Sequence, residues 1–97
     1  MNYGNRYLNI LNVICNYYGI NENEFISILS NKEAKYLYLL FISKYNCLDK
    51  QKVRMLLNVK NNSSISYNLK KAEQKLLISQ NFREKYFDIE KDLLKFI

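Results

Sequence analysis

Amide and hydroxyl side chains gather in one short stretch of the chain, at the predicted start of a helix. An asparagine amide can make two hydrogen bonds to the edge of an adenine base. Short hydroxyls and amides at a helix start can bind phosphate. The residues of this kind are Asn61, Asn62, Ser63, Ser64, Ser66 and Tyr67.

Basic side chains flank this stretch and suit contacts with a phosphate backbone. They are Lys50, Lys52, Arg54, Lys60, Lys70 and Lys71. The 97-residue chain has a net charge of +6, and this charge is concentrated in its middle. Nine basic residues against Glu33 and Asp49 give residues 30–71 a charge of +7, whereas residues 1–29 carry −1 and residues 72–97 are neutral. The pattern predicts an anionic partner.

Other chemistry has little support in the residue types. The chain has no histidine, which excludes histidine general bases and histidine-containing zinc sites. Cys15 and Cys47 are too few for a structural zinc site and stand among apolar residues, as core cysteines do. Ser63 and Ser64 beside Lys60 are interpreted as a helix cap with a phosphate contact, not as a Ser–Lys catalytic pair. We therefore expect no enzyme activity, no metal and no cofactor.

Helices must position these side chains, because the chain has no proline and its apolar residues recur at helical spacing. The spacing predicts helices over residues 5–18, 21–28, 31–45 and 49–58, a longer one from about residue 62 to a break at residues 80–82, and a last one over residues 83–97. The sequence thus predicts an all-α fold, a compact bundle of five to six helices. We expect residues 1–97 to form a single domain.

Helix ends and faces follow from local signals. Gly19 is expected to end the first helix in a left-handed conformation, with Ile20 folded back on the last turn. Ser30 and Glu33 form a predicted capping box for the helix over residues 31–45. That helix is rich in bulky residues nearly all round, so it is expected to be central.

Two further helices show one-sided patterns. In the longer one, the predicted core stripe leaves Lys70 and Lys71 on other faces. The stripe consists of Ile65, Leu69, Ala72 and Leu76. The last segment is amphipathic, with apolar residues at Phe87, Leu93, Leu94 and Ile97.

The helices over residues 49–58 and 62–80, joined by a polar turn, form a helix-turn-helix pattern at about residues 49–80. In this motif the second helix presents its first side chains to base edges in the major groove. We therefore assign base reading to Asn61, Asn62, Ser63, Ser66 and Tyr67. Phosphate contacts are assigned to Ser64 and to the basic residues Lys50, Lys52, Arg54, Lys60, Lys70 and Lys71.

Three stretches of the chain are similar to one known family. Residues 14–20 (I-C-N-Y-Y-G-I) are similar to the family's opening V-x-x-Y/F-F-G-I. Residues 57–65 (L-N-V-K-N-N-S-S-I) correspond to its signature F-G-G-R-D-H-S-T-V, and residues 70–73 (K-K-A-E) resemble its K-K-I-E. The chain thus resembles the C-terminal DNA-binding domain (domain IV) of the bacterial chromosomal replication initiator DnaA.

The resemblance implies a Trp-repressor-like helix-turn-helix, and it places Lys35 near an arginine that the family uses in the minor groove. The chain departs from the family at its glycine pair, here Asn58 and Val59, and at its Asp-His pair, here Asn61 and Asn62. The contacts of that Asp-His pair therefore do not transfer. No G-x-x-x-x-G-K-[ST] loop is present, so this chain by itself is not expected to act as an ATP-driven initiator.

The sequence thus favours a non-enzymatic protein that binds double-stranded DNA in replication or transcription control. It is expected in the cytoplasm, associated with the nucleoid, in a bacterial or phage setting. No apolar run is long enough to span a membrane, so no membrane partner is expected. The alternative is a protein-interaction or homodimerisation module that kept the fold and lost base reading. Tyrosines would then supply the interface, with Tyr3, Tyr7, Tyr36 and Tyr67 as the first candidates.

Overall fold

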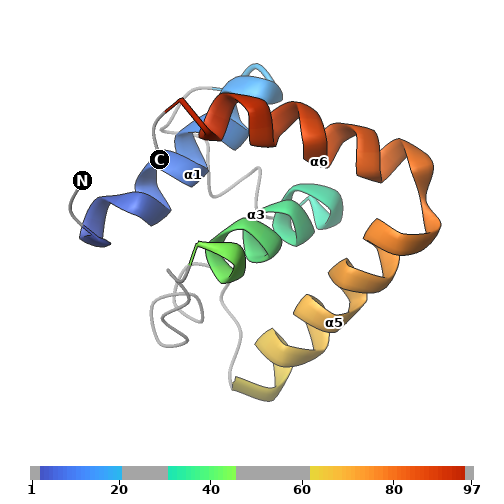
Figure 1. Ribbon diagram of the computed structural model, residues 1–97. Helices are drawn as coiled ribbons and strands as arrows, with labels where there is room; N and C mark the ends of the chain where they lie inside the picture. Colours follow the sequence, from blue (N-terminus) through green and yellow to red (C-terminus); the bar gives the residue numbers. More distant parts are fainter. Residues whose placement is uncertain (1–2, 21–30, 46–61, 96–97) are drawn as a thin grey trace.

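The computed structural model describes residues 3–20, 31–45 and 62–95 (Figure 1). Every regular element in these ranges is a helix: α1 covers Tyr3–Tyr17, α3 covers Lys32–Lys44, α5 covers Asn62–Ile78 and α6 covers Gln80–Leu93. The prediction of an all-α fold is therefore confirmed. The helices predicted over residues 21–28 and 49–58 lie outside the described residues.

Helix α3 lies at the centre of the arrangement (Figure 1). Helices α1 and α5 pack against it, and α6 returns from the end of α5 to contact α1. Every residue from Tyr36 to Ile42 is buried, as expected of a helix that has neighbours on all sides. The prediction that residues 31–45 contain the central helix is confirmed.

The core draws side chains from all four described helices. In α5 the predicted stripe is confirmed, because Ile65 and Ala72 are buried and Leu69 and Leu76 pack against the core. Cys15 of α1 is buried in the same core, as its apolar surroundings predict. The largest fully buried side chains are Tyr38, Phe41, Phe82, Ile10, Leu11, Ile14, Leu37, Leu39, Ile42, Ile65, Ile89 and Leu93.

The end of α1 has the predicted form. Gly19 adopts a positive φ of 70°, which L side chains rarely adopt. Its N–H donates to the Asn16 carbonyl at 3.1 Å, and the Ile20 N–H donates to the Cys15 carbonyl at 2.9 Å. These two bonds define a Schellman motif, and Ile20 packs against the core beneath it.

The start of α3 differs from the prediction. Asn31 is the N-cap, and its side-chain oxygen accepts from the N–H groups of Glu33 at 2.9 Å and Ala34 at 3.4 Å. Asparagine caps a helix as well as serine does. The Glu33 carboxylate accepts instead from the Tyr18 hydroxyl and the Lys85 ammonium. The carboxylate predicted for the capping box thus bonds to side chains from other parts of the fold.

The joint between α5 and α6 lies at Ser79, slightly before the predicted break at residues 80–82. The Ser79 hydroxyl caps α6 by accepting from the Phe82 N–H at 3.2 Å. Arg83 Nη1 donates to the carbonyl oxygens of Leu76 at 3.1 Å and Leu77 at 2.9 Å, which satisfies acceptors at the end of α5. The Ser79 side chain thus caps the start of α6, and the Arg83 side chain caps the end of α5.

The buried face of α6 corrects the sequence prediction. Phe82, Tyr86, Ile89 and Leu93 are buried, whereas Phe87 and Leu94 are exposed. These buried residues recur at helical spacing, and the helix that carries them begins at Gln80, three residues earlier than predicted. Of the apolar residues named in advance for this segment, Leu93 alone is shown to be buried, and Ile97 lies outside the described range.

Candidate nucleic-acid interface

The outer face of α5 carries five of the predicted binding residues. Since Ile65, Leu69, Ala72 and Leu76 face the core, residues half a turn away face solvent. The exposed side chains that share this outer face along the first half of the helix are Ser63, Ser66, Tyr67, Lys70 and Lys71. In Figure 1 the first turns of α5, drawn in yellow, point away from α1 and α6.

Tyr67 is the largest group on this face and is 62% exposed. The ammonium of Lys71, one helical turn later, lies 5.5 Å from the centre of its ring. This separation is within the range of a cation–π contact. The contact holds Tyr67 and Lys71 beside one another on the outer face. Sequence reasoning named both residues but missed their pairing, which the i, i+4 spacing would have indicated.

Two polar side chains near this face are less exposed. Ser64 is half-buried, and its carbonyl oxygen accepts from Asn68 Nδ2 at 2.7 Å. The Asn68 amide is therefore directed back to its own helix. Ser64 is less accessible to a phosphate than Ser63 and Ser66 are.

The electrostatics of this half of α5 favour an anion. No carboxylate occurs from Asn62 to Ala72. The helix N-terminus contributes a partial positive charge to its first turn. Among the described residues, the salt bridges join other lysines to acids, and neither Lys70 nor Lys71 takes part in them. Both ammonium groups are thus available to an external anion.

Lys35 lies in the first turn of α3 and is half-buried. The neighbouring Glu33 feels the charge of Lys75, which belongs to the last turns of α5. The rise of a helix puts Lys75 about 18 Å along α5 from Ser63. The structure therefore does not bring Lys35 together with the side chains on the first turns of α5.

The remaining residues predicted to contact DNA lie outside the part of the chain that the structure describes. Asn62 begins α5, but its side chain is not among those described. The other residues outside the described ranges are Asn61, Lys50, Lys52, Arg54 and Lys60. The first helix and the turn of the expected helix-turn-helix lie there too. Of the tyrosines proposed as interface candidates, Tyr36 is buried and Tyr67 is exposed.

A polar node at Glu33 joins three helices and was not predicted. Its Oε1 accepts from the hydroxyl of Tyr18, the residue that follows α1, at 2.9 Å. It also accepts from Lys85 Nζ of α6 at 2.7 Å. Burial raises the pKa of the Glu33 carboxyl, but the hydrogen bonds from Lys85 and Tyr18 and the charges of Lys85 and Lys75 outweigh it and hold this pKa below 4.5. Burial, with the bond to Glu33, raises the pKa of the Tyr18 hydroxyl. No local sequence signal indicates these partners, because Lys85 is 52 residues away.

A second polar contact joins the far end of α3 to α6. The Lys44 ammonium pairs with the Glu90 carboxylate, and this bond raises the pKa of Lys44. Beside it, the rings of Phe41 and Tyr86 stack with centroids 4.5 Å apart. The charges of α6 that contact α3 are therefore used within the fold.

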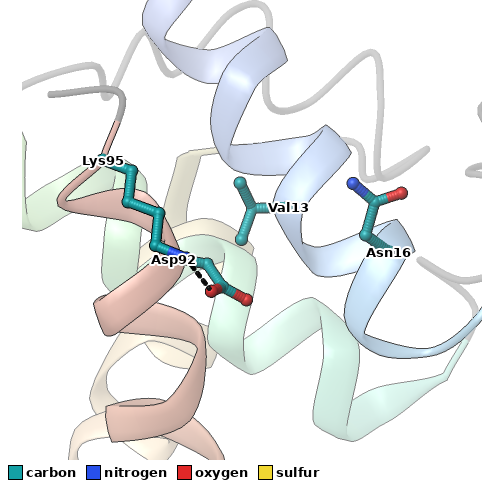
Figure 2. Close-up of a pocket in the computed structure, with 4 residues that line it drawn as sticks. All are labelled: Val13, Asn16, Asp92 and Lys95. Atoms are coloured by element: carbon teal, nitrogen blue, oxygen red, sulfur yellow. Dashed lines mark ion pairs between the residues drawn. The ribbon is translucent and has the colours of Figure 1, made fainter.

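A hollow between α1 and the end of α6 offers little to a ligand (Figure 2). It is lined by Val13, Asn16, Asp92 and Lys95 and measures about 220 Å³. Ligand pockets usually begin at about 300 Å³. Asp92 and Lys95 pair at 3.6 Å across its edge, so their charges offset one another. Among the described residues, no three His, Cys, Asp or Glu side chains come together as metal ligands.

Comparisons with protein families, curated proteins and solved structures found no match to this chain. Within the described part of the chain, no helix has both the length and the apolar character needed to cross a membrane.

Proposed function

We propose that this protein binds double-stranded DNA without catalysing a reaction, through a helix-turn-helix whose second helix is α5. The observation that supports the proposal is the outer face of α5, which combines an exposed ring, exposed hydroxyls and two lysines that form no salt bridge with any described residue. No carboxylate occurs in this helix up to Ala72. Side chains of these types on the first turns of a helix can read base edges in a major groove.

The proposed architecture is a bundle of five to six helices over residues 1–97, similar to the DnaA C-terminal domain and the Trp-repressor-like group. Residues 49–58 would form the first helix of the motif. The first turns of α5 would enter the major groove, with Lys50, Lys52, Arg54, Lys60, Lys70 and Lys71 at phosphates. The setting would be replication or transcription control at the nucleoid.

Lys35 requires a separate test within this proposal. If the duplex meets only the first turns of α5, Lys35 lies away from it, because the start of α3 is beside the last turns of α5, where Lys75 acts on Glu33. It reaches a minor groove only if the duplex also passes beside the first turn of α3. Lys35→Ala therefore distinguishes a duplex held by the helix tip from a duplex held across both helices.

The experiment is a fluorescence-anisotropy titration of random and enriched duplexes at several salt concentrations. Log affinity should fall with log salt by about 0.9 for each neutralised phosphate. Lys70→Ala and Lys60→Ala should each flatten this slope by about that amount, and Asn62→Ala should change sequence preference more than salt dependence. Lys91→Ala, an exposed lysine of α6, is the matched control. Failure to bind any duplex at about 50 mM salt would refute the proposal.

Exposed apolar side chains support a second candidate, a protein-interaction or homodimerisation module. Leu77 is 77% exposed and Ile78 is 84% exposed at the end of α5. Phe87 of α6 and Leu94, which follows α6, are also exposed. Large exposed apolar side chains are typical of interaction surfaces when they form a continuous patch. This function predicts a complex that survives high salt in light scattering, whereas the DNA complex dissociates.

A further inference from the structure

We propose that Tyr67 reads the C5-methyl group of thymine, which makes A·T base pairs the preferred contact of the α5 outer face. This inference rests on the DNA binding proposed above and names the base feature that one side chain recognises. It starts from the exposure of Tyr67, from its pairing with Lys71 and from the chemistry of base edges.

The ring of Tyr67 is an apolar surface that the fold leaves in water. Its 62% exposure contrasts with the burial of Tyr36, Tyr38 and Tyr86. The residues that share its face and lie nearest to it toward the start of α5 are Ser63 and Ser66, whose side chains are short. Among the described side chains of the first two turns of α5, the ring is therefore the largest exposed group.

Lys71 restrains the ring. Its ammonium lies 5.5 Å from the ring centre and occupies one face, so the opposite face and the ring edge remain for a partner. A side chain that is already held in place loses less conformational freedom on binding. The same ammonium brings positive charge beside the ring, which suits a site close to a phosphate backbone.

Major-groove base edges offer one apolar feature, the thymine methyl group, among polar donors and acceptors. An exposed ring that enters this groove can bury most apolar surface against that methyl group. Burial of one methyl-sized group changes affinity by about fourfold. Tyr67 should therefore discriminate A·T from G·C pairs by about this factor for each methyl that it contacts.

The test compares duplexes that differ only in the methyl group. Anisotropy titrations would use an A·T-rich duplex, the same duplex with uracil in place of every thymine, and a G·C-rich duplex with or without 5-methylcytosine. The wild-type protein should bind the thymine duplex about fourfold more tightly than the uracil duplex. It should also bind the 5-methylcytosine duplex more tightly than the cytosine duplex.

Two variants assign the effect to the ring. Tyr67→Ala should abolish the thymine-to-uracil ratio while keeping the salt dependence, and Tyr67→Phe should keep the ratio because the ring remains. Since Tyr67 is exposed, both variants should fold, which circular dichroism checks. Gln74→Ala, at an exposed position of α5 to which no part in binding is assigned, is the control that should keep the ratio.

Three results would overturn the inference. The first is a wild-type ratio near one, and the second is a ratio that persists in Tyr67→Ala. The third is tighter binding to a single-stranded oligonucleotide of the same sequence, which would indicate that the ring stacks on unpaired bases. The salt series measures duplex binding separately, so these results overturn the inference and leave the proposed function standing. A protein that binds no duplex at all loses both.

Discussion

Helices α5 and α6 leave the same joint at Ser79 and use their charged residues in opposite ways. Lys85 and Glu90 of α6 bond to Glu33 and Lys44 of α3. Among the described residues, no such bond ties Lys70 or Lys71 of α5 to an acid. The difference indicates that the charges of α6 contribute to the fold, whereas those of the first half of α5 remain available for a partner.

The largest expected effect tests the α3–α6 seam, the contact in which Phe41 of α3 stacks on Tyr86 of α6. Phe41 is fully buried and stacks on Tyr86, so Phe41→Ala should lower the free energy of unfolding by about 3–5 kcal/mol. Urea denaturation measures this change. Phe87→Ala, which truncates an exposed ring on the same helix as Tyr86, is the matched control and should cost much less. Equal losses at the two positions would show that the seam is not the stabilising contact.

A smaller effect tests the Glu33 node. Glu33→Gln should lower the free energy of unfolding by about 1 kcal/mol at neutral pH, because the bond to Lys85 loses its charge. Glu73→Gln, at an exposed carboxylate of α5, should change it little.

Glu33→Gln should also change how the free energy of unfolding depends on pH. The pKa of Glu33 is lower in the folded protein than its ordinary value of 4.5, so the unfolded chain takes up the proton more readily. The stabilisation is therefore complete above pH 4.5 and is lost as the pH falls through the lowered pKa. Glu33→Gln should have a shallower acid dependence than the wild type in denaturation series from pH 7 to pH 3. Parallel curves for the two proteins would contradict the assignment.

The helix cap at Ser79 should contribute about as much to the free energy of unfolding as the Glu33 carboxylate does. Ser79→Ala removes the acceptor for the Phe82 N–H and should cost about 1 kcal/mol, which corresponds to a fall in Tm of about 4–8 °C. Ser66→Ala on the exposed face of α5 should leave Tm nearly unchanged. A similar fall in both variants would remove the capping role assigned to Ser79.

The smallest effect on stability is expected at the outer face of α5. Lys70→Ala should change the free energy of unfolding by less than about 0.5 kcal/mol, since the side chain is exposed. The same variant should flatten the salt dependence of DNA binding. A clear loss of stability in thermal denaturation would show that Lys70 serves the fold, as the charges of α6 do.

Local sequence signals predicted the features that depend on local spacing. The glycine end of α1, the core stripe of α5 and the buried α3 follow from residues within one or two turns of each other. Tertiary contacts decided the rest. Glu33 bonds to Lys85 and not to the expected backbone N–H, and packing against the rest of the core selects Phe82, Tyr86 and Ile89 over Phe87 and Leu94 as the buried residues of this segment.

The candidate interface also has one feature that local spacing predicts and one that depends on tertiary contacts. The exposure of Ser63, Ser66 and Tyr67 follows from the stripe on the opposite face of α5. The separation of Lys35 from these residues depends on which ends of α3 and α5 lie side by side, and periodicity within one helix carries no information about that pairing.

The Glu33 node also bears on the order in which the chain folds. It links residues 15 positions apart through Tyr18 and 52 positions apart through Lys85, so the second bond closes a long loop. Contacts between distant residues cost more chain entropy to form than contacts within one helix. The Glu33–Lys85 bond is therefore expected to form late, and its loss should accelerate unfolding more than it slows folding.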